Sequence, residues 1–272
     1  MLAKYIGSLL GDGYISKGAK RSINYYYQEH FGESQREYRI WKLSKLKNLG
    51  FTINGNYLRS KSHPYFTNLY PLLYPNGIKS LTSSFLSKCN HPIFITTLYL
   101  DDGSLNFSYH YNKEKNTLYC HPSIQLYTLN LTRNENVSLA EHLNQTFNTN
   151  FSISSHPDGN KSLLKLNKEI DVRYFLNLIK PYVQEIPSMK YKTCLEEKIR
   201  LYNNKIKERY GKEVIIKISS SSRRNPYSTL ELNTIIQMKR SGYKDKEIAS
   251  KLGRTYWSVI YKMSELRKKG LL

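Results

Sequence analysis

The stretch YIGSLLGDGYIS at residues 5–16 and the stretch IFITTLYLDDGSL at residues 93–105 share one pattern. Each is an apolar run that predicts a buried helix, and each run stops at Asp-Gly. An acid at a helix C-terminus is unfavourable by about 0.3–1 kcal/mol, because that end of the helix already carries partial negative charge. Because this unfavourable placement of an acid occurs in both runs, we expect the two acids to share a function.

Small residues form a stripe along the first of these helices. Ala3, Gly7 and Gly11 recur every four positions, which places them on one side of a helix. A second helix can approach closely along such a stripe. We therefore expect the two apolar helices to pack directly against each other.

The last residues of each run are candidates for a metal site. Gly13 is expected to take the left-handed conformation that ends a helix, which places Asp12 at the C-terminus. If the helices pack together, Asp12 and Asp102 converge, and their carboxylates with the carbonyls of the last helical turn form an oxygen cage for a divalent cation. The alternative is a buried helix pair with two solvated terminal acids.

Charge and composition narrow the class of partner. The chain has 272 residues with 42 Lys and Arg against 21 Asp and Glu, a net charge of +21. Such a charge indicates an acidic polymer, above all nucleic acid, with a basic ribosomal-type protein as the alternative. No apolar run reaches the ~18 residues that a membrane span needs, so we expect no membrane partner. The three cysteines form no C-x-x-C pair, so neither a disulfide framework nor a zinc site is expected.

The first 200 residues read as a diverged repeat. Alternating, β-branched and aromatic residues predict strands at 22–31 and 51–60 in the first part, and at 118–128, 151–156 and 162–167 in the second. Amphipathic helices are expected at 36–50 and 134–147, and short closing helices within 68–81 and 175–192. The apolar face of the first amphipathic helix is assigned to Ile40, Leu43, Leu46 and Leu49. This order predicts an α+β fold, a pseudo-twofold pair of αββαββα halves.

The C-terminal residues predict a separate helical domain. A helix is expected at 193–209 and a polar, basic linker at 216–228. Ser228 and Glu231 then form a capping box, and glycine-marked turns separate three helices in the manner of a helix-turn-helix. From Lys205 onward the chain has 17 Lys and Arg against 6 Asp and Glu, a net of +11, which favours DNA contact over a protein-interaction module. The predicted domains are 1–92, 93–200, 201–227 (helix end and linker) and 228–272.

The segments YIGSLLGDG and ITTLYLDDG resemble the two signature motifs of LAGLIDADG homing endonucleases, of the monomeric type that carries both motifs in one chain. The resemblance covers about residues 1–195. It implies that the motif helices form a central two-helix interface and that two saddle-shaped antiparallel sheets straddle the DNA major groove. The second motif departs from the signature at Thr97 and Asp101, where small residues usually pack.

The resemblance also implies the metal ligands. The last acid of each motif maps to Asp12 and Asp102, assisted by the carbonyl groups of Gly11 and Asp101. The expected cofactor is Mg²⁺ or Mn²⁺.

One basic residue per half lies near the scissile phosphates in this family. Lys79 in NGIKSL and Lys192 in SMKYKTC occupy the matching loops, with Lys190 as the alternative to Lys192. A lysine there can stabilise charge on the phosphorane or help to activate water.

Side chains on the sheets would read bases in the major groove, where Gln suits adenine and Arg suits guanine. The third C-terminal helix could add contacts to flanking DNA, although its Trp257 and Tyr261 serve equally well as core residues. The candidates for DNA binding are Gln28, His30, Arg59, Gln125, Tyr127, Arg254 and Tyr256.

The resulting prediction is a monomeric, metal-dependent endodeoxyribonuclease that makes a double-strand break at a long target in double-stranded DNA during intron homing. Two alternatives stay open: an RNA maturase whose partner is intron RNA, and a DNA-binding regulator that leaves DNA intact. Asp12 and Asp102 favour the nuclease, because an RNA binder has no need of a metal cage. Richness in Lys, Asn, Ile and Tyr is typical of an AT-rich genome, so a mitochondrion or other organelle is the expected location.

Overall fold

A computed structural model describes most of the chain, which divides into two units, Met1–Ser221 and Ser222–Leu272. Each unit is considered by itself. The described residues are 7–18, 21–46, 49–210, 214–218 and 226–272.

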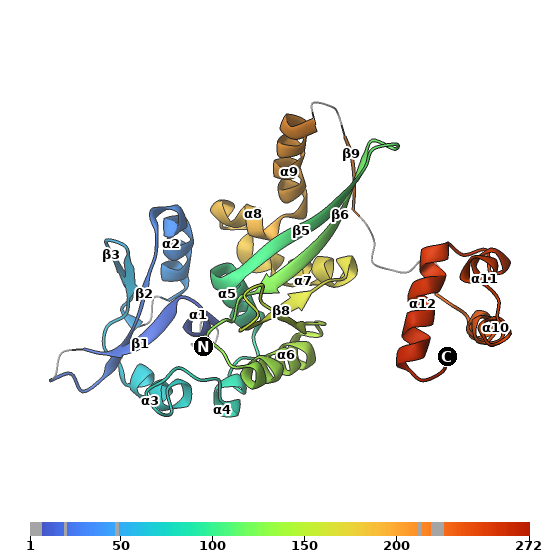
Figure 1. Cartoon of the computed structure of the whole chain (residues 1–272). Helices are drawn as coiled ribbons and strands as arrows, with labels where there is room; N and C mark the ends of the chain where they lie inside the picture. Colours follow the sequence, from blue (N-terminus) through green and yellow to red (C-terminus); the bar gives the residue numbers. More distant parts are fainter. Residues whose placement is uncertain (1–6, 19–20, 47–48, 211–213, 219–225) are drawn as a thin grey trace. The chain divides into compact units, whose positions relative to one another are not determined.

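The first half of the larger unit begins with a motif helix and continues through two strand pairs (Figure 1). A helix follows each pair. The elements are α1 (Gly7–Leu10), β1 (Gly13–Lys17), β2 (Tyr25–His30), η2 (Glu33–Gln35), α2 (Arg36–Lys45), β3 (Thr52–Asn54), β4 (Tyr57–Arg59), α3 (Pro64–Leu73) and α4 (Ser83–Leu86).

The second half repeats this order and extends it. Its elements are α5 (Pro92–Asp102), β5 (Gly103–Asn112), β6 (Thr117–Leu126), α6 (Arg133–Phe147), β7 (Ser152–Ser155), β8 (Ser162–Leu166), α7 (Glu169–Val183), η4 (Pro187–Met189), α8 (Lys190–Thr193), α9 (Leu195–Tyr210) and β9 (Ile215–Ile218).

The two sheets have the same strand order, which confirms the predicted repeat and fold class. The first sheet runs β1-β2-β4-β3 and the second β5-β6-β8-β7, with antiparallel neighbours in both. One face of each sheet is apolar: Ile15 and Leu58 are buried in the first sheet, and Ile124 and Leu164 in the second. Period-two burial of this kind leaves the opposite face of each sheet for polar residues.

Three differences from the sequence expectations concern strands. The strands β1 and β5, which directly follow the two motifs, were not among the expected stretches. β9 pairs in parallel with β6 at Ile215–Ile218, so these residues extend the second sheet and the expected linker is shorter. The free edge of a strand offers backbone hydrogen bonds to a neighbouring extended segment. Whether a segment lies beside such an edge cannot be read from its composition.

The glycines after the motifs are needed for space and not for a left-handed turn. Gly103 is extended, with φ −94° and ψ 159°, and neither it nor Gly13 has a positive φ. A Cβ on Gly13 would lie 2.4 Å from the Tyr27 hydroxyl, and one on Gly103 would lie 2.0 Å from the Tyr99 ring. The expectation for Gly13 was therefore wrong: each glycine admits an aromatic ring as the chain turns from helix to strand.

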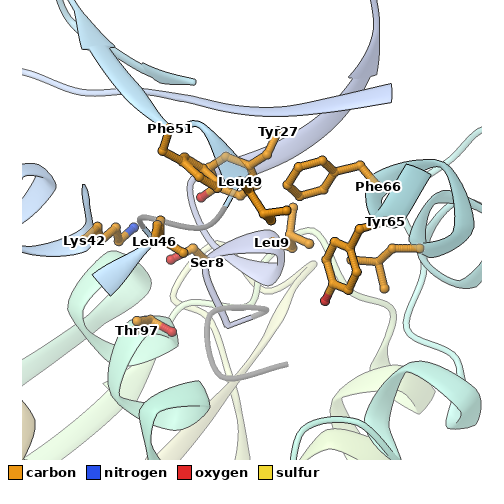
Figure 2. Close-up of a pocket in the computed structure, with 11 residues that line it drawn as sticks. Ser8, Leu9, Tyr27, Lys42, Leu46, Leu49, Phe51, Tyr65, Phe66 and Thr97 are labelled. Carbon is orange, nitrogen blue, oxygen red and sulfur yellow. The ribbon is translucent and has the colours of Figure 1, made fainter. Parts of the chain in front are cut away.

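A small cavity lies in the core of the first half, lined mainly by apolar and aromatic side chains such as Leu9, Tyr27 and Phe66 (Figure 2). Its volume is about 30 Å³, which suits a water molecule and no larger guest. Chemistry on a polymer must therefore take place elsewhere. No helix among the described residues is long and apolar enough to cross a membrane.

The smaller unit is a trio of helices, α10 (Thr229–Arg240), α11 (Asp245–Lys251) and α12 (Tyr256–Lys268). The capping box of Ser228 and Glu231 is present as predicted, and Thr255 caps α12. Gly242 and Gly253 have positive φ at the two turns. The core consists of Ile235, Ile248, Ala249, Val259, Met263 and Leu266.

Candidate active site

The two motif helices α1 and α5 pack against each other at the centre of the larger unit (Figure 1). A Cβ on Gly7 would lie 2.1 Å from the carbonyl oxygen of Phe94, and one on Gly11 would lie 2.7 Å from the Cβ of Asp101. Only glycine fits at either position without a shift of the partner helix. These two residues form the predicted close seam, whereas Ala3 lies outside the described residues.

Asp12 and Asp102 stand at the ends of these helices, and both are partly exposed. Burial raises the pKa of Asp102 to about 7, and the negative charges of Asp101 and Asp12 add to the shift. The two motifs thus bring their acids into one region, where carboxylates repel one another.

The donor set fits a hard divalent cation. Asp12 and Asp102 supply carboxylate oxygens, which Mg²⁺ prefers, and a cation beside them would offset the repulsion that acts on Asp102. Across the described ranges, no three His, Cys, Asp or Glu side chains are arranged to hold one ion. The remaining ligands would therefore be water, carbonyl oxygens or substrate phosphates.

Lys79 and Lys192 reach the same helix ends. Lys79 lies in the loop between α3 and α4, as expected, whereas Lys192 lies in the short helix α8 and not in a loop. Lys79 Nζ donates to the carbonyl oxygen of Gly11 at 3.3 Å. Lys192 Nζ donates to the carbonyl oxygens of Leu100 at 2.7 Å and Asp101 at 3.3 Å. The two carbonyl groups assigned to the metal from the sequence thus accept hydrogen bonds from these lysines.

Burial lowers the pKa of both Lys79 and Lys192, while the nearby aspartates act in the opposite direction. Lys190, the alternative to Lys192, is exposed. The geometry therefore places one partly buried ammonium group at the end of each motif helix.

A cluster of buried charges beside Asp12 was missed from the sequence. Arg39 on α2 contacts Asp12 at 2.5 Å and Glu29 at 3.2 Å. Lys42, one turn further along, lies 2.8 Å from Glu29 and 2.9 Å from Asp101. The side chains of Glu29, Arg39 and Asp101 are fully buried. The side chain of Asp101 is thus committed to ion pairs, so only its carbonyl group remains for a metal.

Of the four residues expected on the apolar face, Leu46 and Leu49 are buried and Leu43 packs against the core, but Ile40 is 53% exposed. The cluster was missed because Arg39 and Lys42, which are buried, were not placed on the buried side of α2. The sequence feature that could have identified these two residues is a pair of aromatic side chains. Tyr38 directly precedes Arg39, Trp41 directly precedes Lys42, and both rings are buried. Aromatic residues mark the buried side of an otherwise charged helix.

Gln28, His30 and Arg59 lie on one face of the first sheet, opposite its apolar face. Gln28 pairs in register with both Tyr14 and Arg59. His30 and Arg59 are exposed, but Gln28 is only 7% exposed and its amide donates to the Tyr14 hydroxyl. In the row of Tyr14, Gln28 and Arg59, the exposed side chains are therefore those of Tyr14, at 39%, and Arg59, whereas Gln28 between them is covered.

Gln125 and Tyr127 lie at the end of β6 in the second sheet, and both are partly exposed. The Tyr127 hydroxyl donates to Gln125 Oε1 at 2.6 Å. Gln125 also pairs in register with Ser104 and Lys165, so this row carries hydroxyl, amide and ammonium groups.

In the smaller unit, Arg254 is engaged within its own fold. Its guanidinium donates to Glu231 at 2.8 Å and joins α10 to the turn before α12. Tyr256, Trp257 and Tyr261 are 38%, 65% and 73% exposed, so neither Trp257 nor Tyr261 is a core residue.

Residues 4–171 match the profile of the LAGLIDADG DNA endonuclease family. Among curated proteins, "Protein RecA" of Mycobacterium shimoidei is 26% identical over 192 residues, which cover 69% of this chain and 44% of that protein. This chain therefore spans less than half the length of that relative. Among solved structures, the homing endonuclease I-WcaI bound to its DNA recognition sequence is 24% identical with a TM-score of 0.54. The similarity covers 71% of this chain and 86% of that one, and it supports the fold.

Proposed function

Because the chain belongs to the LAGLIDADG DNA endonuclease family, we propose that it is a site-specific endodeoxyribonuclease that cuts both strands of double-stranded DNA. The two motifs occur in one chain, so a monomer supplies both cutting centres. Enzymes of this family depend on divalent metal ions, and Mg²⁺ is the ion that we propose here, with Mn²⁺ as a substitute.

The convergence of the two motif ends carries this proposal. Asp12 and Asp102 lie where a divalent ion would be held, and Lys79 and Lys192 each bring a positive charge to one helix end. When bound, the ion supplies an activated water and stabilises charge on the attacking and leaving oxygens. One acid and one lysine per motif provide for one cut per strand.

The protein groups orient this chemistry. Arg39, whose side chain is fully buried, holds one oxygen of the Asp12 carboxylate. Lys79 and Lys192, partly buried, offer cations to a phosphate whose negative charge grows in the transition state. The polar faces of the two sheets, with Arg59, His30 and Lys165, would contact the DNA.

The smaller unit would contact DNA outside the central target. Tyr256, Trp257 and Tyr261 lie on α12, the third helix of the trio, and all are exposed. In a helix-turn-helix this helix enters the major groove. The basic charge of the C-terminal region supports a polyanionic partner.

The test is cleavage-site selection from a DNA library, followed by assays on a supercoiled plasmid that carries the selected site. Linear product is expected with Mg²⁺ and none with EDTA. Asp12→Asn or Asp102→Asn should abolish the linear product and leave gel-shift binding in place. Asp158→Asn, in the loop between β7 and β8, is the matched control and should cut normally.

The other functions give different results in the same assay. A regulator would bind the site and leave it intact with Mg²⁺. A maturase would accelerate splicing of an intron transcript whether or not Asp12 and Asp102 were changed. Cleavage that survives both substitutions would refute the metal assignment.

A further inference from the structure

We propose that Glu37 and Glu135 are positioning residues, each of which holds the lysine segment of the opposite half in place for cleavage. Glu37 belongs to the first half and contacts the segment before Lys192. Glu135 belongs to the second half and contacts the loop after Lys79. The inference rests on the proposed function, because it assigns these segments to the cutting of DNA.

The two carboxylate oxygens of Glu135 accept hydrogen bonds from two different segments of the chain. Oε1 accepts from the Ser80 hydroxyl at 2.8 Å and from the Leu81 backbone N–H at 2.7 Å. Oε2 accepts from the backbone N–H of Thr132 at 2.7 Å, which completes the capping box of α6. Ser80 directly follows Lys79, so the start of α6 fixes the chain beside that lysine.

Glu37 makes the corresponding contact in the other direction. It lies in the first turn of α2, and its Oε2 accepts from the Ser188 backbone N–H at 2.7 Å. Ser188 lies in η4, which leads directly into α8 and Lys192. Nearby, Glu185 accepts from Lys45 Nζ at 2.9 Å, so an ion pair also ties α2 to this stretch.

Glu37 is the acidic residue in the first turn of α2, where its charge also favours the helix. The N-cap of α2 makes no side-chain hydrogen bond, and Glu37 is exposed. Hydrogen bonding from Ser188 lowers the pKa of Glu37, and hydrogen bonds from Leu81 and Thr132 outweigh burial to lower that of Glu135. Both side chains are thus ionised, and each accepts at least one hydrogen bond from the other half.

The geometry of each lysine therefore depends on the half that does not contain it. Lys79 and Lys192 contact helix-end carbonyl groups at 2.7–3.3 Å, and a small displacement of either segment would move the cation from its place. Misplacement of a reacting group by about 1 Å costs about 100-fold in rate. Loss of one glutamate should consequently slow one cut more than the other.

The experiment measures the two strands separately, on a duplex with a different fluorophore at each 5′ end. Lys79→Met and Lys192→Met first establish which strand depends on which lysine. Glu135→Ala should then slow the Lys79-dependent strand about 10- to 100-fold more than the other strand. Glu37→Ala should do the same to the Lys192-dependent strand. Glu→Gln at either position should recover part of the rate, because the amide oxygen still accepts.

Two controls separate positioning from stability. Thr132→Ala weakens the cap of α6, including the hydroxyl that donates to Glu135 Oε2, but keeps Glu135 Oε1 and its contacts with Ser80 and Leu81. Glu33→Ala removes an exposed glutamate near Glu37. Both should leave the strand ratio unchanged. Amide hydrogen exchange, read without metal or DNA, should quicken at Leu81 in Glu135→Ala and at Ser188 in Glu37→Ala.

Equal slowing of both strands, or unchanged exchange at these amides, would overturn the inference about Glu37 and Glu135. The proposed function would still stand in that case if the wild-type protein cuts its site. A wild-type protein that binds its site and never cuts would overturn the proposed function, and with it the role of both anchors in cleavage.

Discussion

Lys42 is a buried charge whose removal should destabilise the larger unit strongly. Its Nζ lies 2.8 Å from Glu29 and 2.9 Å from Asp101, and the three side chains are 2%, 0% and 0% exposed. Lys42→Met keeps the apolar stem and leaves two buried carboxylates without their shared cation. Breaking a buried ion pair costs about 3–5 kcal/mol. Arg39 still neutralises part of the cluster, so we expect the lower end, about 3 kcal/mol.

Lys45→Met is the matched control, because it makes the same change one turn further along α2. Lys45 Nζ lies 2.9 Å from Glu185, but the side chains are 35% and 54% exposed. An exposed pair of this kind contributes only about 0.2–1 kcal/mol. Distance is thus the same in both pairs, and burial is what differs.

Urea unfolding followed by tryptophan fluorescence measures both variants. Trp41 lies buried in α2, and Trp257 lies exposed in the smaller unit. A Trp257→Phe background therefore leaves a single reporter in the larger unit. Equal losses for Lys42→Met and Lys45→Met, or a loss under about 1 kcal/mol for Lys42→Met, would refute the assignment of a strongly coupled buried cluster.

Three further outcomes are expected. Gly103→Ala places a Cβ 2.0 Å from the Tyr99 ring and should cost about 1–3 kcal/mol in the same urea assay, whereas Gly32→Ala, with nothing within 4 Å, should be close to neutral. The pKa of Glu231 is lowered to about 2 by its hydrogen bonds from Arg254, so its contribution to stability is present above pH 4.5 and is lost as pH falls toward about 2. Acid titration of tryptophan fluorescence in a Trp41→Phe background, where Trp257 is the single reporter, should show this loss, and Glu231→Gln in the same background should show a weaker pH dependence. DNA affinity measured by fluorescence anisotropy should fall steeply with salt, with a log–log slope of about −0.9 per phosphate contact, and a slope near zero would contradict backbone recognition.

The local and repeating features of this protein could be read from its sequence. The Asp-Gly endings, the strand alternation and the helix caps at Ser228 and Thr255 depend on residues close together in the chain. Their physical causes act over a few residues, so pattern and spacing suffice. The repeated order of elements then restricted the fold to two matching halves.

The tertiary structure alone decided which polar groups are buried and what they contact. Arg39 and Lys42 look like solvent-facing charges in α2, and only the packing of that helix against the motif seam makes them partners of Asp12 and Asp101. β9 likewise becomes a strand only because an edge of β6 is available to it.

The contacts of Glu37 and Glu135 join residues 151 and 54 positions apart. A sequence specifies the side chain and its charge, but an ion pair or hydrogen bond also requires a partner at about 3 Å, and the fold decides which distant residue arrives there.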